Sequence, residues 1–116
     1  MTDIDSANLD VHNPAEPYRA HAEFHARQSP TGIGAAVSNS GFEGAKHIWE
    51  CIVTDGREWH YVRVLGSDLE PYPNLSSEDI EQAIERFAAT LPTAHRIRHL
   101  LNANPLHIDR HGKIRD

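Results

Sequence analysis

The clearest pattern of apolar and polar positions in the chain is a pair of strand-like runs around a tight-turn dipeptide. KHIWECIVT at 46–54 and REWHYVRVL at 57–65 are rich in β-branched and aromatic residues, which favour strands. Asp55-Gly56 between them is typical of a two-residue type I′ turn, in which both central residues have positive φ. The pattern therefore predicts a β-hairpin.

Both faces of this hairpin carry apolar side chains. A two-residue turn places Trp49 opposite Val62, and it places Cys51 opposite His60. These residues lie on the slightly more apolar face, which we assign to the core. The second face still holds more apolar surface than a protein usually leaves in water, so we expect the chain itself or a partner to cover it. The candidate interface or pocket residues on this second face are Ile48, Glu50, Ile52, Trp59, Tyr61 and Arg63.

Two helices are predicted after the hairpin. Ser76 can cap the first, and apolar residues then recur at spacings of three and four, which predicts a helix over 76–91. Thr93 can cap a second helix over 93–103, which Asn104-Pro105 would end. The acidic residues of the first helix are expected to form a solvated face: Glu78, Asp79, Glu81 and Glu85.

The segment before the hairpin is ambiguous. Residues 18–27 alternate between apolar and polar types, which predicts a half-buried strand. Alanine, glutamate and arginine in this segment favour a helix instead, and Asn13-Pro14 could begin one. We predict the strand, followed by a turn and a short returning strand over 33–38.

These elements predict an α+β fold. The expected sheet is antiparallel, with three to four strands in a meander around the central hairpin of 46–54 and 57–65. Helix 76–91 would cover one face of the sheet, and helix 93–103 would pack beside it. A length of 116 residues fits one domain, predicted over 14–116 after a flexible acidic segment at 1–13.

Charge is unevenly distributed along the chain, whose net charge is −6. Residues 1–92 hold 15 acidic side chains and 6 lysines or arginines, whereas residues 93–116 hold two acidic and five basic side chains. An acidic body disfavours binding to nucleic acid, where phosphate contacts dominate affinity, although the basic C-terminal segment keeps that alternative open. The chain has neither a long apolar run nor a secretory signal. With Cys51 as its one cysteine, it is predicted to be cytoplasmic and to need no membrane.

Histidine is unusually frequent, with nine residues, and three pairs share the spacing His-x-x-x-His. On a helix this spacing places two imidazoles on one face, as many zinc sites require. On strands, two stretches would each place two histidines and a carboxylate on one face, a ligand set used by zinc and non-haem iron. Nearby arginines oppose a metal, so a solvated polar stripe is the alternative. The stretches supply His21, Glu23 and His25, and His107, Asp109 and His111.

A thiol beside an imidazole, as in the predicted pair Cys51 and His60, can act as a nucleophile. However, no orienting group or oxyanion donor accompanies the pair, and a buried cysteine usually serves as a small apolar residue. The chain therefore favours a non-enzymatic binding or interaction protein that forms a homodimer through the second face of the hairpin. The alternatives are a zinc or iron protein, with or without metalloenzyme activity, and a nucleic-acid-associated protein.

Overall fold

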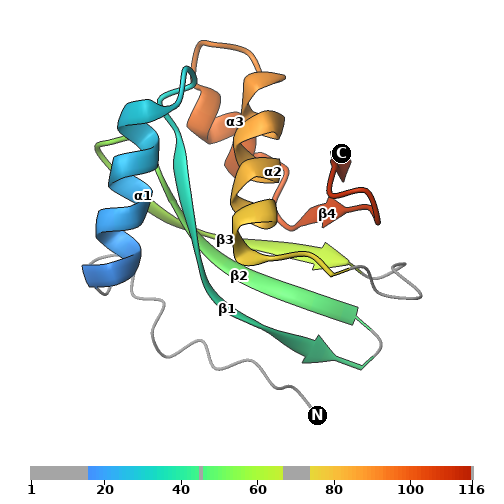
Figure 1. Ribbon diagram of the computed structural model, residues 1–116. Helices are drawn as coiled ribbons and strands as arrows, with labels where there is room; N and C mark the ends of the chain where they lie inside the picture. Colours follow the sequence, from blue (N-terminus) through green and yellow to red (C-terminus); the bar gives the residue numbers. More distant parts are fainter. Residues whose placement is uncertain (1–15, 45, 67–73, 116) are drawn as a thin grey trace.

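The computed structural model describes residues 16–44, 46–66 and 74–115, which form one sheet with helices packed on both of its faces (Figure 1). The predicted α+β class is confirmed, whereas the flexible segment predicted at 1–13 lies outside the described residues. Within these residues no helix has the length and hydropathy of a membrane span. The elements are α1 (Glu16–Gln28), β1 (Gly34–Glu43), β2 (Lys46–Thr54), β3 (Trp59–Gly66), α2 (Ser77–Ala89), α3 (Arg96–Asn102), β4 (Leu106–Ile108) and β5 (Ile114–Arg115).

The sheet has five strands in the order β1-β2-β3-β4-β5. Neighbouring strands are antiparallel except β3 and β4, which are parallel. The prediction of three to four antiparallel strands was therefore incomplete. The additional strands come from the C-terminal segment, where β4 has three residues and β5 has two, and β4 adds a parallel pairing to the sheet.

The central hairpin forms as predicted, but its loop is longer. Strand β2 ends at Thr54 and β3 begins at Trp59, which leaves a loop of four residues rather than two. The Asp55 carboxylate oxygen Oδ1 accepts the N–H groups of residues 57 and 58, at 3.0 and 3.1 Å. The Asp55 side chain thus accepts hydrogen bonds from backbone N–H groups that lie outside the strand pairing in this longer loop. Within the described loop only Gly56 has positive φ, so the turn is not type I′.

The longer loop shifts the strand pairing by two residues. Trp49 faces Val64, and Cys51 faces Val62 rather than His60. Because side chains alternate with a period of two, a two-residue shift changes the partners but leaves each side chain on its predicted face. The predicted core face is therefore confirmed although the predicted partners were wrong.

Helix α2 packs on that core face. Ser76 caps the helix by accepting the N–H of Asp79, whose carboxylate accepts the N–H of Ser76 in return. The predicted N-cap is confirmed, within helix bounds slightly shorter than 76–91. The apolar stripe of α2 joins β2 and β3 in the main core through Ile80, Ala83, Ile84, Phe87 and Ala88.

Helix α1 corrects the prediction of a strand over 18–27. In the structure the inward positions recur every four residues: Ala22 and Ala26 are buried and Tyr18 packs beside them, whereas Phe24 is 53% exposed. The apparent alternation came from alanines that serve a helix equally well. The helix-forming composition of the segment was the better guide.

Helix α1 lies on the opposite face of the sheet from α2. Ala35 of β1 belongs to the core under α2, while its neighbour Ala36 packs with Ala22 of α1. Successive strand residues point to opposite faces, so β1 runs between the two helices, as Figure 1 shows. Strand β1 extends well beyond the predicted 33–38, reaching Glu43.

Helix α3 is shorter than the predicted 93–103. It begins at Arg96 after His95, which has left-handed backbone geometry with φ 58° and forms no side-chain cap. The predicted cap at Thr93 was therefore wrong. The helix packs inward through Leu100, which is buried, and through Ile97, which packs against the main core.

Candidate metal centre

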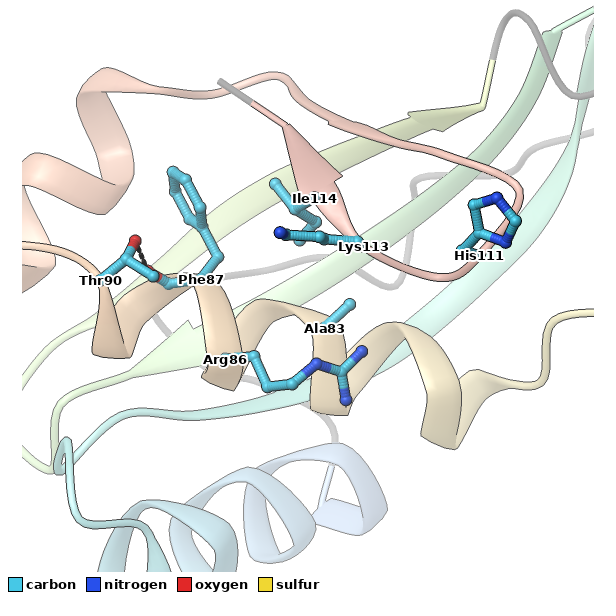
Figure 2. Close-up of a pocket in the computed structure, with 7 residues that line it drawn as sticks. All are labelled: Ala83, Arg86, Phe87, Thr90, His111, Lys113 and Ile114. Atoms are coloured by element: carbon cyan, nitrogen blue, oxygen red, sulfur yellow. Dashed lines mark hydrogen bonds between the residues drawn. The ribbon is translucent and has the colours of Figure 1, made fainter.

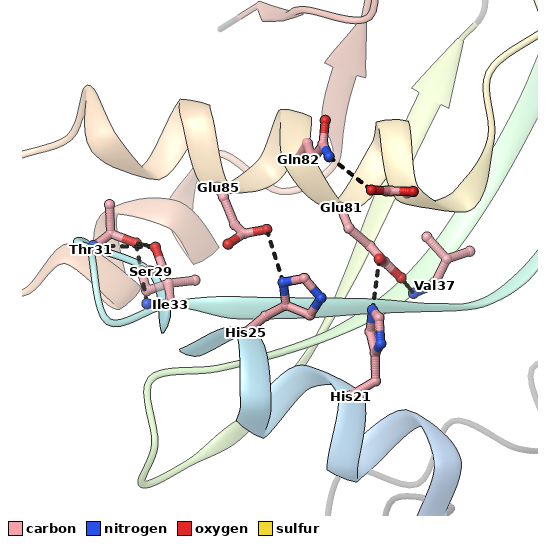
Figure 3. A network of polar contacts seen from close by, with 10 residues as sticks. His21, His25, Ser29, Thr31, Ile33, Val37, Glu81, Gln82 and Glu85 are labelled. Carbon is pink, nitrogen blue, oxygen red and sulfur yellow. Dashed lines mark hydrogen bonds and ion pairs between the residues drawn. The ribbon is translucent and has the colours of Figure 1, made fainter. Parts of the chain in front are cut away.

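Helix α1 presents two histidines side by side. His21 and His25 are one helical turn apart, so both imidazoles project from the same face. Their ring centroids lie 4.4 Å apart with the ring planes tilted by 52°. Figure 3 shows both rings pointing from α1 toward α2.

Helix α2 presents two carboxylates at the same spacing. His21 Nε2 lies 2.8 Å from Glu81 Oε1, within hydrogen-bond distance. His25 Nδ1 lies 3.8 Å from Glu85 Oε2, close enough for an ion pair if the imidazole is protonated. The two helices therefore meet through two successive imidazole–carboxylate contacts (Figure 3).

Glu81 is the most enclosed member of this cluster, with a side chain that is 8% exposed. Its second oxygen, Oε2, accepts the N–H of Val37 at 3.1 Å. The pairing of β1 with β2 shifts register immediately after Val37, and β1 is an edge strand. An edge strand has N–H groups without a strand partner, so the α2 carboxylate satisfies one of them. This contact fixes the carboxylate and leaves Oε1 directed at His21.

His21, His25 and Glu81 together have the composition and spacing of a metal site. Their candidate ligand atoms all lie within 4.8 Å of one another. A tetrahedral zinc ion with ligands at about 2.1 Å requires these atoms to be about 3.4 Å apart. His21 Nε2 and Glu81 Oε1 lie closer than this, at 2.8 Å, so a bound ion would replace their hydrogen bond. The His21 side chain is 44% exposed, which leaves the outer side of the cluster open to water.

Glu85 lies at the border of this cluster. Burial raises the pKa of its carboxyl group, and the nearby Glu81 carboxylate raises it further, while His25 and His21 oppose the shift. A side chain placed here can orient His25 by accepting its Nδ1–H, as carboxylates do for metal-bound histidines. Glu85 is therefore a candidate supporting residue.

The structure brings together only part of the predicted ligand set. Glu23 lies on α1 but forms an ion pair with Arg19 at 3.8 Å. His107 lies on β4, which β2 and β3 separate from β1. Asp109 and His111 belong to the turn after β4, where Asp109 accepts backbone N–H groups. The first predicted stretch therefore lies on helix α1 and the second on β4 and the turn after it, so the two do not lie on adjacent strands.

The sequence prediction missed Glu81, because all acidic residues of this helix were expected to be solvated. The pattern contained a signal against that expectation. Glu81 lies three residues before Ile84 and seven before Ala88, which places it on the flank of the buried stripe. A carboxylate at such a position requires partners, which are His21 and the N–H of Val37.

The predicted binding face of the hairpin is largely covered within one chain. Ile48, Glu50 and Ile52 are only 1%, 3% and 2% exposed. Tyr61 donates from its hydroxyl to Glu50 Oε2 at 2.7 Å. The other two members also have partners: Trp59 packs against the small core under α1, and Arg63 pairs with Glu43. Self-association through this face stays a prediction.

Cys51 has no geometry for nucleophilic catalysis. It is fully buried, and Val62 rather than His60 is its cross-strand partner. Burial strongly raises the pKa of the thiol, and the carboxylates of Glu81 and Glu50 raise it further. Since the thiolate is the reactive form, Cys51 acts here as a small core residue.

Comparison of the chain with protein-family models, with curated proteins and with solved structures finds no match.

Proposed function

We propose that this protein binds a divalent transition-metal ion, with zinc as the preferred ion, through His21, His25 and Glu81. The observation that carries the proposal is the convergence of these ligand atoms from two helices within 4.8 Å. Glu81 is buried and fixed by the N–H of Val37, so one ligand is already oriented. Two imidazoles and one carboxylate form a donor set found in zinc sites that keep an open coordination position.

The same donor set is also used by non-haem iron. Zinc is the better choice here because sites of a given nitrogen and oxygen composition bind zinc more tightly than ferrous iron. A metal held by these residues would face water on the exposed side of His21. Such a site could bind a further ligand from solution or polarise a water molecule.

The principal alternative is a polar contact that joins α1 to α2 and binds no metal. Both hypotheses predict that removing Glu81 weakens the contact between the helices. Only metal binding predicts that added zinc raises the free energy of unfolding, because an ion that binds the folded state stabilises it. The two hypotheses therefore differ in a measurement made with and without the ion.

The test is calorimetric titration of the untagged protein with zinc chloride. We expect one ion per chain and a loss of affinity of at least about tenfold in Glu81→Gln and in His25→Ala, because each substitution removes a ligand. Cobalt should give the visible absorption of a tetrahedral site in the unaltered protein and lose it in both variants.

Matched controls exclude binding by scattered surface groups. Glu78→Gln removes an exposed carboxylate from the same helix, and His99→Ala removes an exposed histidine from α3. Both controls should bind zinc with unchanged affinity. The proposal fails if zinc affinity is equal in Glu81→Gln and the unaltered protein, or if His99→Ala weakens binding as much as His25→Ala does.

A further inference from the structure

A second candidate site lies on the other side of α2, away from the histidine pair. There the helix and the C-terminal segment line a cavity of about 730 Å³ that is open to solvent. Figure 2 shows side chains from both elements around it. This volume lies within the range typical of small-molecule sites.

The inner wall of this cavity is apolar. Ala83, Phe87 and Ile114 line it and are 1%, 7% and 6% exposed. Thr90 lies at the end of α2 and directs its hydroxyl at the carbonyl of Phe87, at 2.6 Å. The wall therefore offers a fixed surface of aromatic and aliphatic groups to a ligand.

The remaining lining residues are basic or can become so. They are Arg86, His111 and Lys113, and no acidic side chain lines the cavity. Among the described residues, neither Arg86 nor Lys113 forms an ion pair. The cavity therefore carries positive charge beside its apolar wall, although the whole chain has a net charge of −6.

Three hydrogen bonds hold Arg86 and the backbone of the C-terminal turn in place. Arg86 donates from Nη2 to the carbonyl of Gly112 at 2.9 Å, which ties the C-terminal turn to α2. Asp109 Oδ1 accepts the N–H groups of His111 and Lys113, at 2.9 and 3.0 Å. Asp109, predicted from sequence as a metal ligand, thus shapes the turn that carries two of the basic residues.

We propose that this cavity binds a small amphipathic carboxylate, with its apolar body against Phe87 and Ile114 and its carboxylate at Arg86 and Lys113. The free donors of a guanidinium match the two oxygens of a carboxylate. The apolar wall disfavours a fully hydrated anion such as inorganic phosphate, because such an ion gains nothing from that surface and must lose water to reach it.

The test compares decanoate with decanol and with inorganic phosphate, using amide chemical shifts of the full chain. Decanoate should shift the amides of Ala83, Phe87 and Ile114 in a saturable manner. Decanol should bind at least about tenfold more weakly, since it lacks the charged hydrogen bonds. Phosphate should leave these amides unshifted. Equal affinity for decanoate and decanol, or no shift at these three amides, would overturn the proposal.

Three variants locate the site. Arg86→Gln combined with Lys113→Gln should reduce decanoate affinity about tenfold or more while leaving that for decanol unchanged. Arg98→Gln, which removes an exposed cation of α3, should have no effect. Thr90→Phe places a large side chain in the cavity from an exposed position and should weaken both ligands. Unchanged decanoate binding in the double variant and in Thr90→Phe would place the ligand elsewhere.

Discussion

Helices α1 and α2 have 13 residues each and pack on opposite faces of the same sheet, but different forces hold them. Helix α2 buries large aliphatic and aromatic side chains in the main core. The buried residues of helix α1 are both alanines, Ala22 and Ala26. The backbone of α1 at these alanines lies directly against Gly34 of β1. The comparison indicates that α2 is held by buried apolar area, whereas α1 is held by close backbone approach and by polar contacts to α2.

The largest effect should follow from removing apolar volume under α2. Ile84 is fully buried, so Ile84→Ala should lower the free energy of unfolding by about 3 kcal/mol through lost burial and a residual cavity. Urea denaturation would measure it. Phe24→Ala on α1 is the control: its side chain is 53% exposed, and the expected change is within about 0.5 kcal/mol. Comparable losses in the two variants would contradict the proposed difference between the helices.

A somewhat smaller effect should follow from adding a single methyl group under α1. A Cβ at Gly34 would lie 2.1 Å from the carbonyl oxygen of Ala22 and 2.4 Å from the backbone nitrogen of Ala26. Backbone atoms cannot move aside as a flexible side chain can, so Gly34→Ala must displace the helix. We expect a loss of about 2 kcal/mol in the free energy of unfolding, as for other overpacked cores.

The Gly34→Ala variant also tests whether α1 is displaced as a unit. Amide hydrogen exchange should accelerate over 16–28 while residues 77–89 change less, and zinc affinity should fall because the histidines move away from Glu81. Ser40→Ala, an exposed position on the same strand, should change none of these. Uniform acceleration across both helices would show that α1 and α2 are not independently held.

The same comparison explains which parts of the fold could be predicted from sequence. Helix α2 was predictable because large apolar residues recur at helical spacing after a recognisable cap at Ser76. Helix α1 was mistaken for a strand because alanine is neutral in such a pattern. Its helix-forming composition was the better local guide, whereas its close approach to the sheet at Gly34 is a contact between distant segments and leaves no local periodicity.

The candidate metal site was predictable in part for the same reason. The spacing of His21 and His25 indicated a zinc-binding pair only if the segment was helical. Assigning it to a strand led instead to Glu23 as the third ligand. The third candidate ligand that the fold brings close, Glu81, is 60 residues from His21 in the chain. It was hidden among acidic neighbours such as Glu78, which does face water, whereas Glu85 is partly buried beside His25.

The cap of α2 should contribute less than the packing of either helix. Ser76 Oγ accepts the N–H of Asp79 at 3.1 Å, and Ser76→Ala would leave that group without its partner. The expected loss is about 1 kcal/mol in the free energy of unfolding, the usual value for an N-cap serine. Thermal unfolding would measure it, and Ser76→Asp should restore most of the loss because aspartate also caps helices. Failure of the aspartate variant to recover stability would contradict a capping role.

The smallest effect concerns the pH dependence of that cap. The N–H of Ser76, donated to the Asp79 carboxylate, holds the pKa of this carboxyl group below its ordinary value. A carboxyl group with a lower pKa in the folded state stabilises the protein above its unfolded pKa of about 3.9. That stabilisation disappears as the pH falls through the folded pKa.

Asp79→Asn should therefore be less stable than the unaltered protein near neutral pH, and the difference should shrink under acidic conditions. Urea midpoints for both proteins across that range would measure this change, and a difference that stays constant down to strongly acidic pH would mean that the ionised carboxylate does not contribute to the cap.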